Sequence, residues 1–161
     1  MLRFIVLFLL MLPFGSSFAP KAVPDFEIET IEQKTVSIKE LLDENKPLVI
    51  SFWTTYCKPC ISELTEIADV YEDWKEEVDF NFLAISIDDS RSLAKVKSVV
   101  FGKDWPFVIG LDPNQIAKRK LNVTNIPQTF IFNPKGELIY QHQGYTPGSE
   151  LEILEKIRTM K

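Results

Sequence analysis

A buried strand that ends just before a pair of cysteines is the feature that most constrains this chain. Residues 47–53 form an almost continuous apolar run that is too short for a helix, as expected of a central strand covered on both faces of a parallel sheet. Residues 57–60 read Cys-Lys-Pro-Cys, and from Lys58 to about Lys75 apolar residues recur at steps of three and four. The sequence therefore predicts a Cys-x-x-Cys pair between a buried strand and the start of an amphipathic helix.

This position favours reversible redox chemistry at the two cysteines. The attacking species in disulfide exchange is the thiolate, and unpaired N–H groups at a helix N-terminus stabilise negative charge. Two intervening residues allow both sulfurs to lie on the first helical turn, where Pro59 suits an early position and Lys58 adds a nearby positive charge. We therefore expect Cys57, closer to the helix start, to be the exposed attacking cysteine and Cys60 to be the buried resolving one.

Other uses of the pair fit the sequence less well. A structural disulfide that closes so short a loop stabilises the fold little. A zinc site needs further ligands, and the chain has only two cysteines and one histidine, His142, on a distant predicted hairpin. Copper carriage is disfavoured because no methionine lies near the pair. We expect His142 to be a partly exposed hairpin residue rather than a catalyst, and we expect neither a metal nor a cofactor.

The rest of the chain alternates between predicted strands and helices. Strands are predicted at 25–29, 35–38, 78–87, 107–109, 128–132 and 137–142. Helices are predicted at 38–43, after a Ser90 cap, from Asp112-Pro113 to about Lys120, and after Thr146 or Ser149, the last with Leu151, Leu154 and Ile157 facing inward. Such alternation predicts an α/β sheet with helices on both faces.

The helix that follows the cysteines is predicted to have one apolar stripe and one acidic face. The stripe consists of Ile61, Leu64, Ala68, Tyr71 and Trp74. The acidic residues are Glu63, Glu66, Asp69, Glu72, Asp73 and Glu76. A helical pattern of this kind favours a solvated face for the acids, with a docking surface as the second interpretation.

The N-terminus has the three-part layout of a secretory signal. A short positive start, Met1 to Arg3, precedes an apolar run from Phe4 to Phe14 and then small residues up to Ala19. The apolar run is about half as long as a membrane-spanning helix, which is the alternative interpretation. We predict a signal peptide at residues 1–19 and one domain at residues 20–161, exported to the periplasm and either released by cleavage or tethered by an uncleaved N-terminus.

Charge and size exclude some partners. The formal net charge is −5, so the chain has no basic field to hold nucleic acid. The nearest approach to a basic cluster is Lys58, Lys118, Arg119 and Lys120, of which three fit an exposed helix end. With 161 residues, 45% of them hydrophobic, the chain has the size and composition of one globular domain, which we expect to be monomeric.

Three segments together resemble a known family. Residues 52–60, Phe-Trp-Thr-Thr-Tyr-Cys-Lys-Pro-Cys, followed by Glu63, resemble the active-site segment of TlpA/ResA-type thioredoxin-fold proteins. Residues 125–130 resemble the family's cis-proline segment, and residues 133–136 resemble its following hairpin turn. The resemblance covers roughly residues 22–160. It implies a thioredoxin fold, three-layer α/β/α with a central mixed sheet, an N-terminal extension and an inserted helix, in an exported protein that acts on protein disulfides or thiols.

The sequence departs from the family pattern at the proton acceptor. Ser51 and Ala84 occupy the places where thioredoxins proper keep a buried Asp and its Lys partner. Glu63, one turn beyond the second cysteine, is our expected catalytic replacement. The pair Asp88–Asp89 is an alternative, and so is a merely solvated carboxylate at each place. Thr65 replaces the proline that commonly kinks this helix in the family.

The resemblance also implies where substrates bind. A cis bond between Ile126 and Pro127 would turn the Ile126 backbone toward a docked substrate strand, whereas the sequence alone also fits a proline at the start of a strand. We expect Tyr56, Lys58 and Pro59 to contact the substrate as well. The partners would be protein thiols or disulfides, and a membrane-bound electron donor would regenerate the dithiol.

Two other functions stay open on the sequence. Residues 54–57, Thr-Thr-Tyr-Cys, imitate the Thr-x-x-Cys of peroxiredoxins, which are thiol peroxidases, although Ile50 stands where that motif has proline. A binding module could also keep the fold without redox turnover. For an oxidoreductase, the sequence leaves the direction of electron flow open, because the reduction potential depends on details of the cysteine loop.

Overall fold

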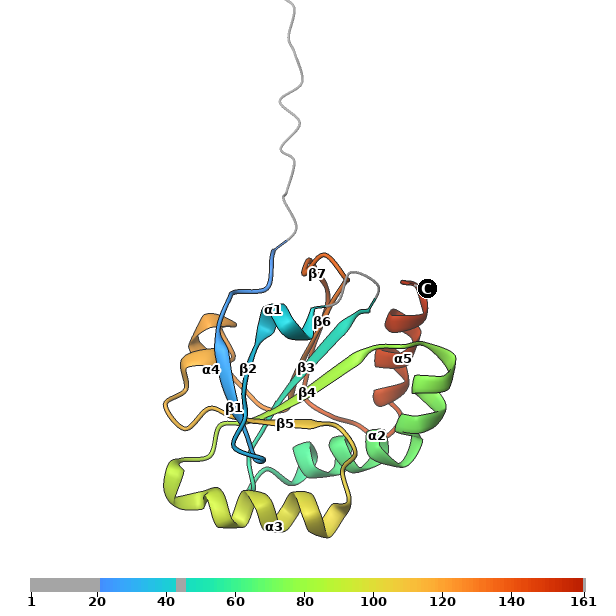
Figure 1. The fold of residues 1–161 in the computed structure, drawn as a ribbon. Helices are drawn as coiled ribbons and strands as arrows, with labels where there is room; N and C mark the ends of the chain where they lie inside the picture. The colour runs from blue at the N-terminus through green and yellow to red at the C-terminus, as the bar shows by residue number, and fades with distance from the viewer. Residues whose placement is uncertain (1–20, 43–45, 161) are drawn as a thin grey trace, which may run out of the picture.

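The computed structural model describes residues 21–42 and 46–160, so the signal peptide predicted at residues 1–19 lies outside the described part. The elements, shown in Figure 1, are β1 (Glu27–Thr30), β2 (Thr35–Ser37), α1 (Ile38–Leu41), β3 (Leu48–Trp53), α2 (Lys58–Glu77), β4 (Asn81–Ser86), η1 (Ser90–Ser92), α3 (Leu93–Lys103), β5 (Val108–Leu111), α4 (Ile116–Lys120), β6 (Gln128–Phe132), β7 (Leu138–Gln143) and α5 (Glu150–Arg158). Among the described residues, no helix combines the length and the apolar character needed to cross a membrane.

A seven-stranded mixed sheet forms the centre of the fold, in the strand order β2-β1-β5-β4-β3-β6-β7. The three strands β3, β4 and β5 run parallel to one another, and the remaining neighbours pair antiparallel. Parallel neighbours need a crossover connection, which α2 supplies between β3 and β4 and α3 between β4 and β5. The predicted α/β thioredoxin fold with a central mixed sheet is confirmed.

The strand β3 explains why the sheet needs helices on both faces. All six of its residues are buried, and its side chains alternate between two core clusters. Val49 and Trp53 pack in the cluster that contains residues of α2, α3 and α5, whereas Leu48, Ile50 and Phe52 pack in the one that contains residues of α1 and α4. Full burial of such a side chain stabilises the fold by about 1.5–3 kcal/mol. The result is the three-layer arrangement of Figure 1.

The N-terminal extension is tied to the rest of the sheet at two places. β1 pairs antiparallel with β5 through Thr30 and Gly110. Gly110 allows this pairing because a Cβ there would stand 2.8 Å from Cγ1 of Ile28. Ahead of β1, Val23 donates its backbone N–H to the carbonyl of Gly136, in the turn before β7, at 2.8 Å. The extension is therefore part of the same seven-stranded sheet as β3, which leads into the cysteine loop.

Two helix starts differ from the sequence prediction. Asp89, rather than Ser90, caps the turn η1, which leads directly into α3. The helix predicted from Asp112-Pro113 begins at Ile116, because Gln115 takes a left-handed conformation with φ 54° and turns the chain first. Asp112 still acts as a cap, since its carboxylate accepts the backbone N–H of Ile116 at 2.7 Å.

The buried faces of α2 and α5 also differ in detail from the predicted stripes. On α2, Ile67 is fully buried where the pattern had placed Ala68, which is only half-buried. Glu63, expected on the solvated face, is 1% exposed. On α5, Leu151 is 54% exposed instead of inward-facing, because Ile153 occupies the buried face. Periodicity leaves neighbouring positions nearly equivalent, and packing against the sheet decides between them.

Candidate active site

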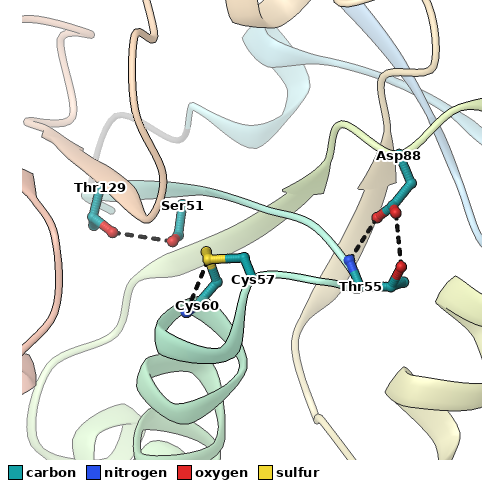
Figure 2. The surroundings of a disulfide bond; sticks show 6 residues. All are labelled: Ser51, Thr55, Cys57, Cys60, Asp88 and Thr129. Atoms are coloured by element: carbon teal, nitrogen blue, oxygen red, sulfur yellow. Dashed lines mark hydrogen bonds between the residues drawn. A yellow bond between two sulfur atoms is a disulfide. The ribbon is translucent and has the colours of Figure 1, made fainter.

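A disulfide between Cys57 and Cys60 caps the N-terminus of α2, as Figure 2 shows. The two Cα atoms lie 5.3 Å apart. Cys57 is the N-cap residue, with an extended backbone, and its Sγ accepts the backbone N–H of Cys60 at 3.2 Å. Pro59 stands in the first turn, where helix N–H groups have no partner within the helix in any case. The sulfur of Cys57 therefore lies at the positive end of a 20-residue helix, which stabilises a thiolate.

The two sulfurs differ in accessibility. Cys60 is fully buried, whereas Cys57 is half-buried. Around Cys57, the side chain of Tyr56 is 73% exposed, and Lys58 and Pro59 are exposed as well. An incoming sulfur can reach Cys57 from solvent and cannot reach Cys60 without a change in the loop.

The loop that leads into the cysteines is held by Asp88, which follows β4. Its carboxylate accepts the backbone N–H of Thr55 at one oxygen and the hydroxyl of Thr55 at the other, each at 2.8 Å (Figure 2). The hydroxyl of Ser86 donates a third hydrogen bond to the same carboxylate, also at 2.8 Å. Asp88 is buried, and its oxygens are occupied by these donors. Its role in the structure is to position the loop.

Glu63 lies on the buried face of α2, one turn beyond Cys60. Among the described residues, no hydrogen-bond partner meets either of its carboxyl oxygens. Burial raises the pKa of the Glu63 carboxyl from its ordinary value of 4.5 to about 8, and the Glu150 carboxylate acts in the same direction. A carboxyl with this pKa can take up or release a proton near neutral pH.

Uncharged polar groups fill the place of the buried Asp–Lys pair of thioredoxins proper. Thr129 donates its hydroxyl to Ser51 Oγ at 3.0 Å, and both side chains are fully buried (Figure 2). In register, Ser51 on β3 stands between Thr129 on β6 and Ala84 on β4. This position offers no carboxylate, so Glu63 is the buried acid on the helix that carries the cysteines.

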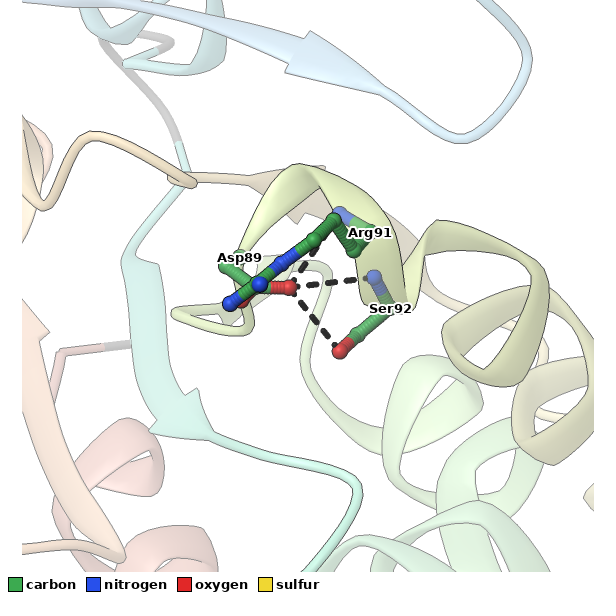
Figure 3. A network of polar contacts seen from close by, with 3 residues as sticks. All are labelled: Asp89, Arg91 and Ser92. Carbon is green, nitrogen blue, oxygen red and sulfur yellow. Dashed lines mark hydrogen bonds and ion pairs between the residues drawn. The ribbon is translucent and has the colours of Figure 1, made fainter.

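Asp89, the second member of the alternative acid pair, points into a different set of contacts. Its carboxylate accepts from the guanidinium of Arg91 at 2.6 Å and from the backbone N–H groups of Arg91 and Ser92, as Figure 3 shows. The hydrogen bond from Arg91 lowers the pKa of Asp89. A carboxylate that is kept ionised at the surface by a cation is poorly suited to hold a proton for Cys60.

The Ile126–Pro127 segment lies beside the cysteine loop. The peptide bond between these residues is cis, Pro127 is buried, and Ile126 is half-buried. The carbonyl of Pro127 accepts the N–H of Gly144 at 2.8 Å, which fixes the segment to the end of β7. Ile126 and Tyr56 line one pocket, so the two predicted docking elements share a surface.

His142 lies on β7, away from the cysteines in the chain, and is half-buried. Its ring stacks on that of Tyr140, with 6.3 Å between the ring centroids. In the part of the chain that the structure describes, no group of three or more His, Cys, Asp or Glu side chains is placed to hold a metal ion.

Comparison with known proteins places the chain in a family. The model of the AhpC/TSA family matches residues 20–141. The chain belongs to the AhpC/TSA family. A curated relative, thiol-disulfide oxidoreductase ResA from Oceanobacillus iheyensis, is 30% identical over 135 residues, which cover 81% of this chain and 68% of that protein. With the Cys57–Cys60 pair in place, this member of the AhpC/TSA family is a thiol–disulfide oxidoreductase.

Solved structures of similar proteins agree with this assignment. A thioredoxin-like protein from Porphyromonas gingivalis is 40% identical, with a TM-score of 0.73, over 86% of this chain and 90% of that one. A thiol:disulfide interchange protein of the thioredoxin family from Chlorobium tepidum TLS has a TM-score of 0.72 at 22% identity, over 88% of this chain and 97% of that one, and shows the shared fold. The resemblance to TlpA/ResA-type proteins is confirmed.

Sequence reasoning missed one part of the site. It treated Asp88 as an alternative proton acceptor, and the structure shows it holding Thr55 instead. The available signal was its position directly after a strand that neighbours β3, since residues at the ends of adjacent parallel strands meet at one edge of the sheet.

Proposed function

We propose that this AhpC/TSA family member reduces disulfides of exported proteins through a dithiol–disulfide cycle of Cys57 and Cys60. One observation carries the proposal: a half-exposed sulfur caps α2, and a buried carboxyl, Glu63, lies one turn further along the same helix. The sulfur can attack as a thiolate, and the carboxyl can hold a proton near neutral pH.

In the first step, the Cys57 thiolate attacks one sulfur of a client disulfide. A bond forms between Cys57 and that sulfur, the client S–S bond breaks, and the other client sulfur leaves as a thiolate that takes a proton from solvent. The backbone N–H of Cys60 and the N-terminal end of α2 stabilise the Cys57 thiolate before the attack.

In the second step, Cys60 attacks the sulfur of Cys57. The ionised form of Glu63, which is populated as the pH approaches its pKa of about 8, accepts the proton of the Cys60 thiol, the bond between Cys57 and the client breaks, and the client sulfur leaves as a thiolate. Two electrons have then passed from the enzyme to the client, and the enzyme is left with the Cys57–Cys60 disulfide seen in the structure.

The client docks on the surface around Cys57. Tyr56, Lys58 and Pro59 are exposed beside the sulfur, and the backbone of Ile126 next to Pro127 offers edge-type hydrogen bonds to an extended client segment. Renewed activity needs two electrons and two protons from a dithiol donor. We place that donor in the membrane, because the secretory layout of residues 1–19 separates the protein from cytosolic reductants.

The experiment that tests the direction of electron flow is a redox titration of Cys57–Cys60 against glutathione. We expect a potential of about −270 mV or lower, typical of a reductant, whereas a value near about −120 mV would indicate an oxidant. The individual roles are tested with a disulfide-containing client protein. Cys57→Ala is expected to abolish turnover, and Cys60→Ala is expected to accumulate a covalent client adduct at Cys57.

Two biochemical results and one cellular result would overturn the proposal. One is the absence of any trapped adduct with Cys60→Ala under conditions where the wild-type protein turns over. The other is consumption of hydrogen peroxide, with a dithiol supplied, at a rate well above that of disulfide reduction, which would indicate a thiol peroxidase. Retention of the cellular role after both cysteines are replaced by serine would indicate a binding module.

A further inference from the structure

A groove extends from the cysteine loop along α4. Its first pocket, of about 300 Å³, is lined by Tyr56, Ile87, Lys118, Thr124, Asn125 and Ile126. Its second pocket, of about 460 Å³, is lined by Gln115, Lys118, Arg119, Asn122, Val123 and Thr124. Lys118 and Thr124 line both pockets, so the two form one continuous surface, here called the α4 groove.

One end of the α4 groove lies at the active disulfide. Tyr56 immediately precedes Cys57, and Ile126 immediately precedes Pro127. Cys57 and Ile126 also pack against the same core cluster. A client segment whose sulfur bonds to Cys57 therefore meets the first pocket directly and can continue into the second.

The α4 groove is positively charged although the whole chain carries a net charge of −5. In the described part of the chain, no carboxylate side chain lines either pocket. The ammonium of Lys118 donates to Gln115 Oε1 at 3.1 Å, and the guanidinium of Arg119 donates to the Asn114 carbonyl at 2.8 Å. Within residues 21–42 and 46–160, neither cation forms an ion pair. Both keep donors free to meet an anionic group.

The backbone around these cations is fixed before any ligand arrives. The buried carboxylate of Asp112 accepts the backbone N–H groups of Ile116 at 2.7 Å and Lys118 at 2.9 Å, which anchors α4 to the end of β5. Both Asp112 oxygens are thereby occupied by backbone donors. Asn122 then turns the chain in a left-handed conformation with φ 55° and lines the second pocket.

We propose that the α4 groove selects client segments with carboxylate side chains close to the reacting cysteine. The client chain would run from Cys57 across Ile126, and its acidic side chains would meet Lys118 and Arg119. This inference rests on the proposed reductase function and adds a substrate class to it. Selection by exposed charges such as those of Lys118 and Arg119 acts mainly on the rate of encounter, and it therefore weakens as the ionic strength rises.

The test uses two peptides of the same sequence, each with one cysteine in a mixed disulfide with 2-mercaptoethanol. In one peptide, glutamates flank the cysteine, and in the other, glutamines take their places. The pre-reduced protein is mixed with each peptide, and the second-order rate constants of reduction are compared as a ratio. We expect the acidic peptide to react about fivefold faster at low salt, as two exposed charge contacts allow.

Two charge variants distinguish an effect of the α4 groove on the rate ratio from an effect of the protein's net charge. The double variant Lys118→Gln/Arg119→Gln is expected to bring the ratio close to one. The double variant Lys95→Gln/Lys97→Gln removes the same charge from α3, outside the α4 groove, and is expected to keep the wild-type ratio. Raising the ionic strength from 0.01 M to 0.15 M, which shortens the Debye length from about 30 Å to about 8 Å, is expected to shrink the wild-type preference.

The possible failures are distinguishable. If the wild-type protein reduces both peptides at equal rates, the proposal that the α4 groove selects acidic clients is wrong, whereas the proposed reductase function is unaffected. If neither peptide is reduced, the proposed function is wrong. Calorimetry with cysteine-free versions of the two peptides then tests the α4 groove alone, and equal affinities for the acidic and the neutral peptide would overturn the proposed selection. Binding to phosphatidylglycerol vesicles that is lost in the Lys118→Gln/Arg119→Gln variant, without any peptide preference, would assign the surface to a membrane instead of a client.

Discussion

Asp88 binds Thr55 through both of its carboxylate oxygens, one accepting the backbone N–H and the other the hydroxyl, each at 2.8 Å. Thr55 lies two residues before Cys57, and Asp88 lies just after β4, the parallel neighbour of β3. The contact therefore fastens the loop that carries the attacking cysteine to the edge of the sheet. It fixes the loop at Thr55, whereas the hydrogen bond that caps α2 fixes it at Cys57.

Replacement of Asp88 by alanine is expected to destabilise the oxidised protein by about 2–4 kcal/mol, because it leaves two buried donors of Thr55 without an acceptor. Urea denaturation measures the change in the free energy of unfolding, and hydrogen exchange at the Thr55 amide should become faster. Asp89→Ala is the matched control. Asp89 is exposed, and its carboxylate accepts hydrogen bonds from Arg91 and Ser92 in its own turn, so we expect a loss below about 1 kcal/mol. Equal losses in the two variants would contradict the positioning role of Asp88.

Replacement of Glu63 by glutamine is expected to slow the second step of the cycle. Without a carboxylate to accept the Cys60 proton, we expect the turnover rate to fall about 100-fold and the Cys57–client mixed disulfide to accumulate. Quenched-flow mass spectrometry of the client adduct measures both effects. The control is Glu66→Gln, which changes an exposed acid on the same helix and is expected to keep the wild-type rates. A slower first step with no accumulated adduct would assign Glu63 to a different role.

The same variant is expected to change how stability depends on pH. Folding raises the pKa of Glu63 from 4.5 to about 8, so between these values the native state binds a proton that the unfolded state has lost. The free energy of unfolding must therefore fall as pH rises through this window, by about 1 kcal/mol per pH unit, and level off above it. Glu63→Gln removes this slope. Urea titrations of the oxidised protein at about pH 5, 6.5 and 8, which roughly span this window, measure the pH dependence of the free energy of unfolding. The same pH dependence in the wild-type protein and in Glu63→Gln would show that the native carboxyl is ionised throughout.

Much of the fold follows from local patterns that leave little choice. The apolar run of β3 needs cover on both faces, and the Cys-x-x-Cys pair behind it needs a helix start, so the strand, the loop and α2 were all predicted. The boundaries were less accurate. Gln115 has a left-handed conformation, so α4 begins only at Ile116, and the residue types from Asp112 onward do not predict this conformation.

The parts of the site that could not be predicted depend on contacts between distant segments. Whether Glu63 faces the core or the solvent depends on how α2 rotates against the sheet, and periodicity alone favoured solvent. The contact between Thr55 and Asp88 joins residues 33 positions apart and becomes visible only when β3 and β4 are placed side by side. The residue types identified the candidate site residues, but the position and contacts of each one depend on tertiary packing.

The close approach of β1 to β5 provides a test of how the N-terminal extension is attached. A Cβ on Gly110 would stand 2.8 Å from Ile28 Cγ1 and 3.3 Å from Leu83 Cδ1, and both neighbours are buried. Gly110→Ala is therefore expected to destabilise the protein by about 1–3 kcal/mol, through overpacking between the strands. Gly102→Ala is the control, because a Cβ there would meet no atom of residues 21–42 or 46–160 within 4 Å and the residue lies inside α3, where alanine is favoured by up to about 1 kcal/mol. Thermal unfolding should shift in opposite directions for the two variants. A harmless Gly110→Ala would mean that β1 does not pack on β5 at this distance in solution.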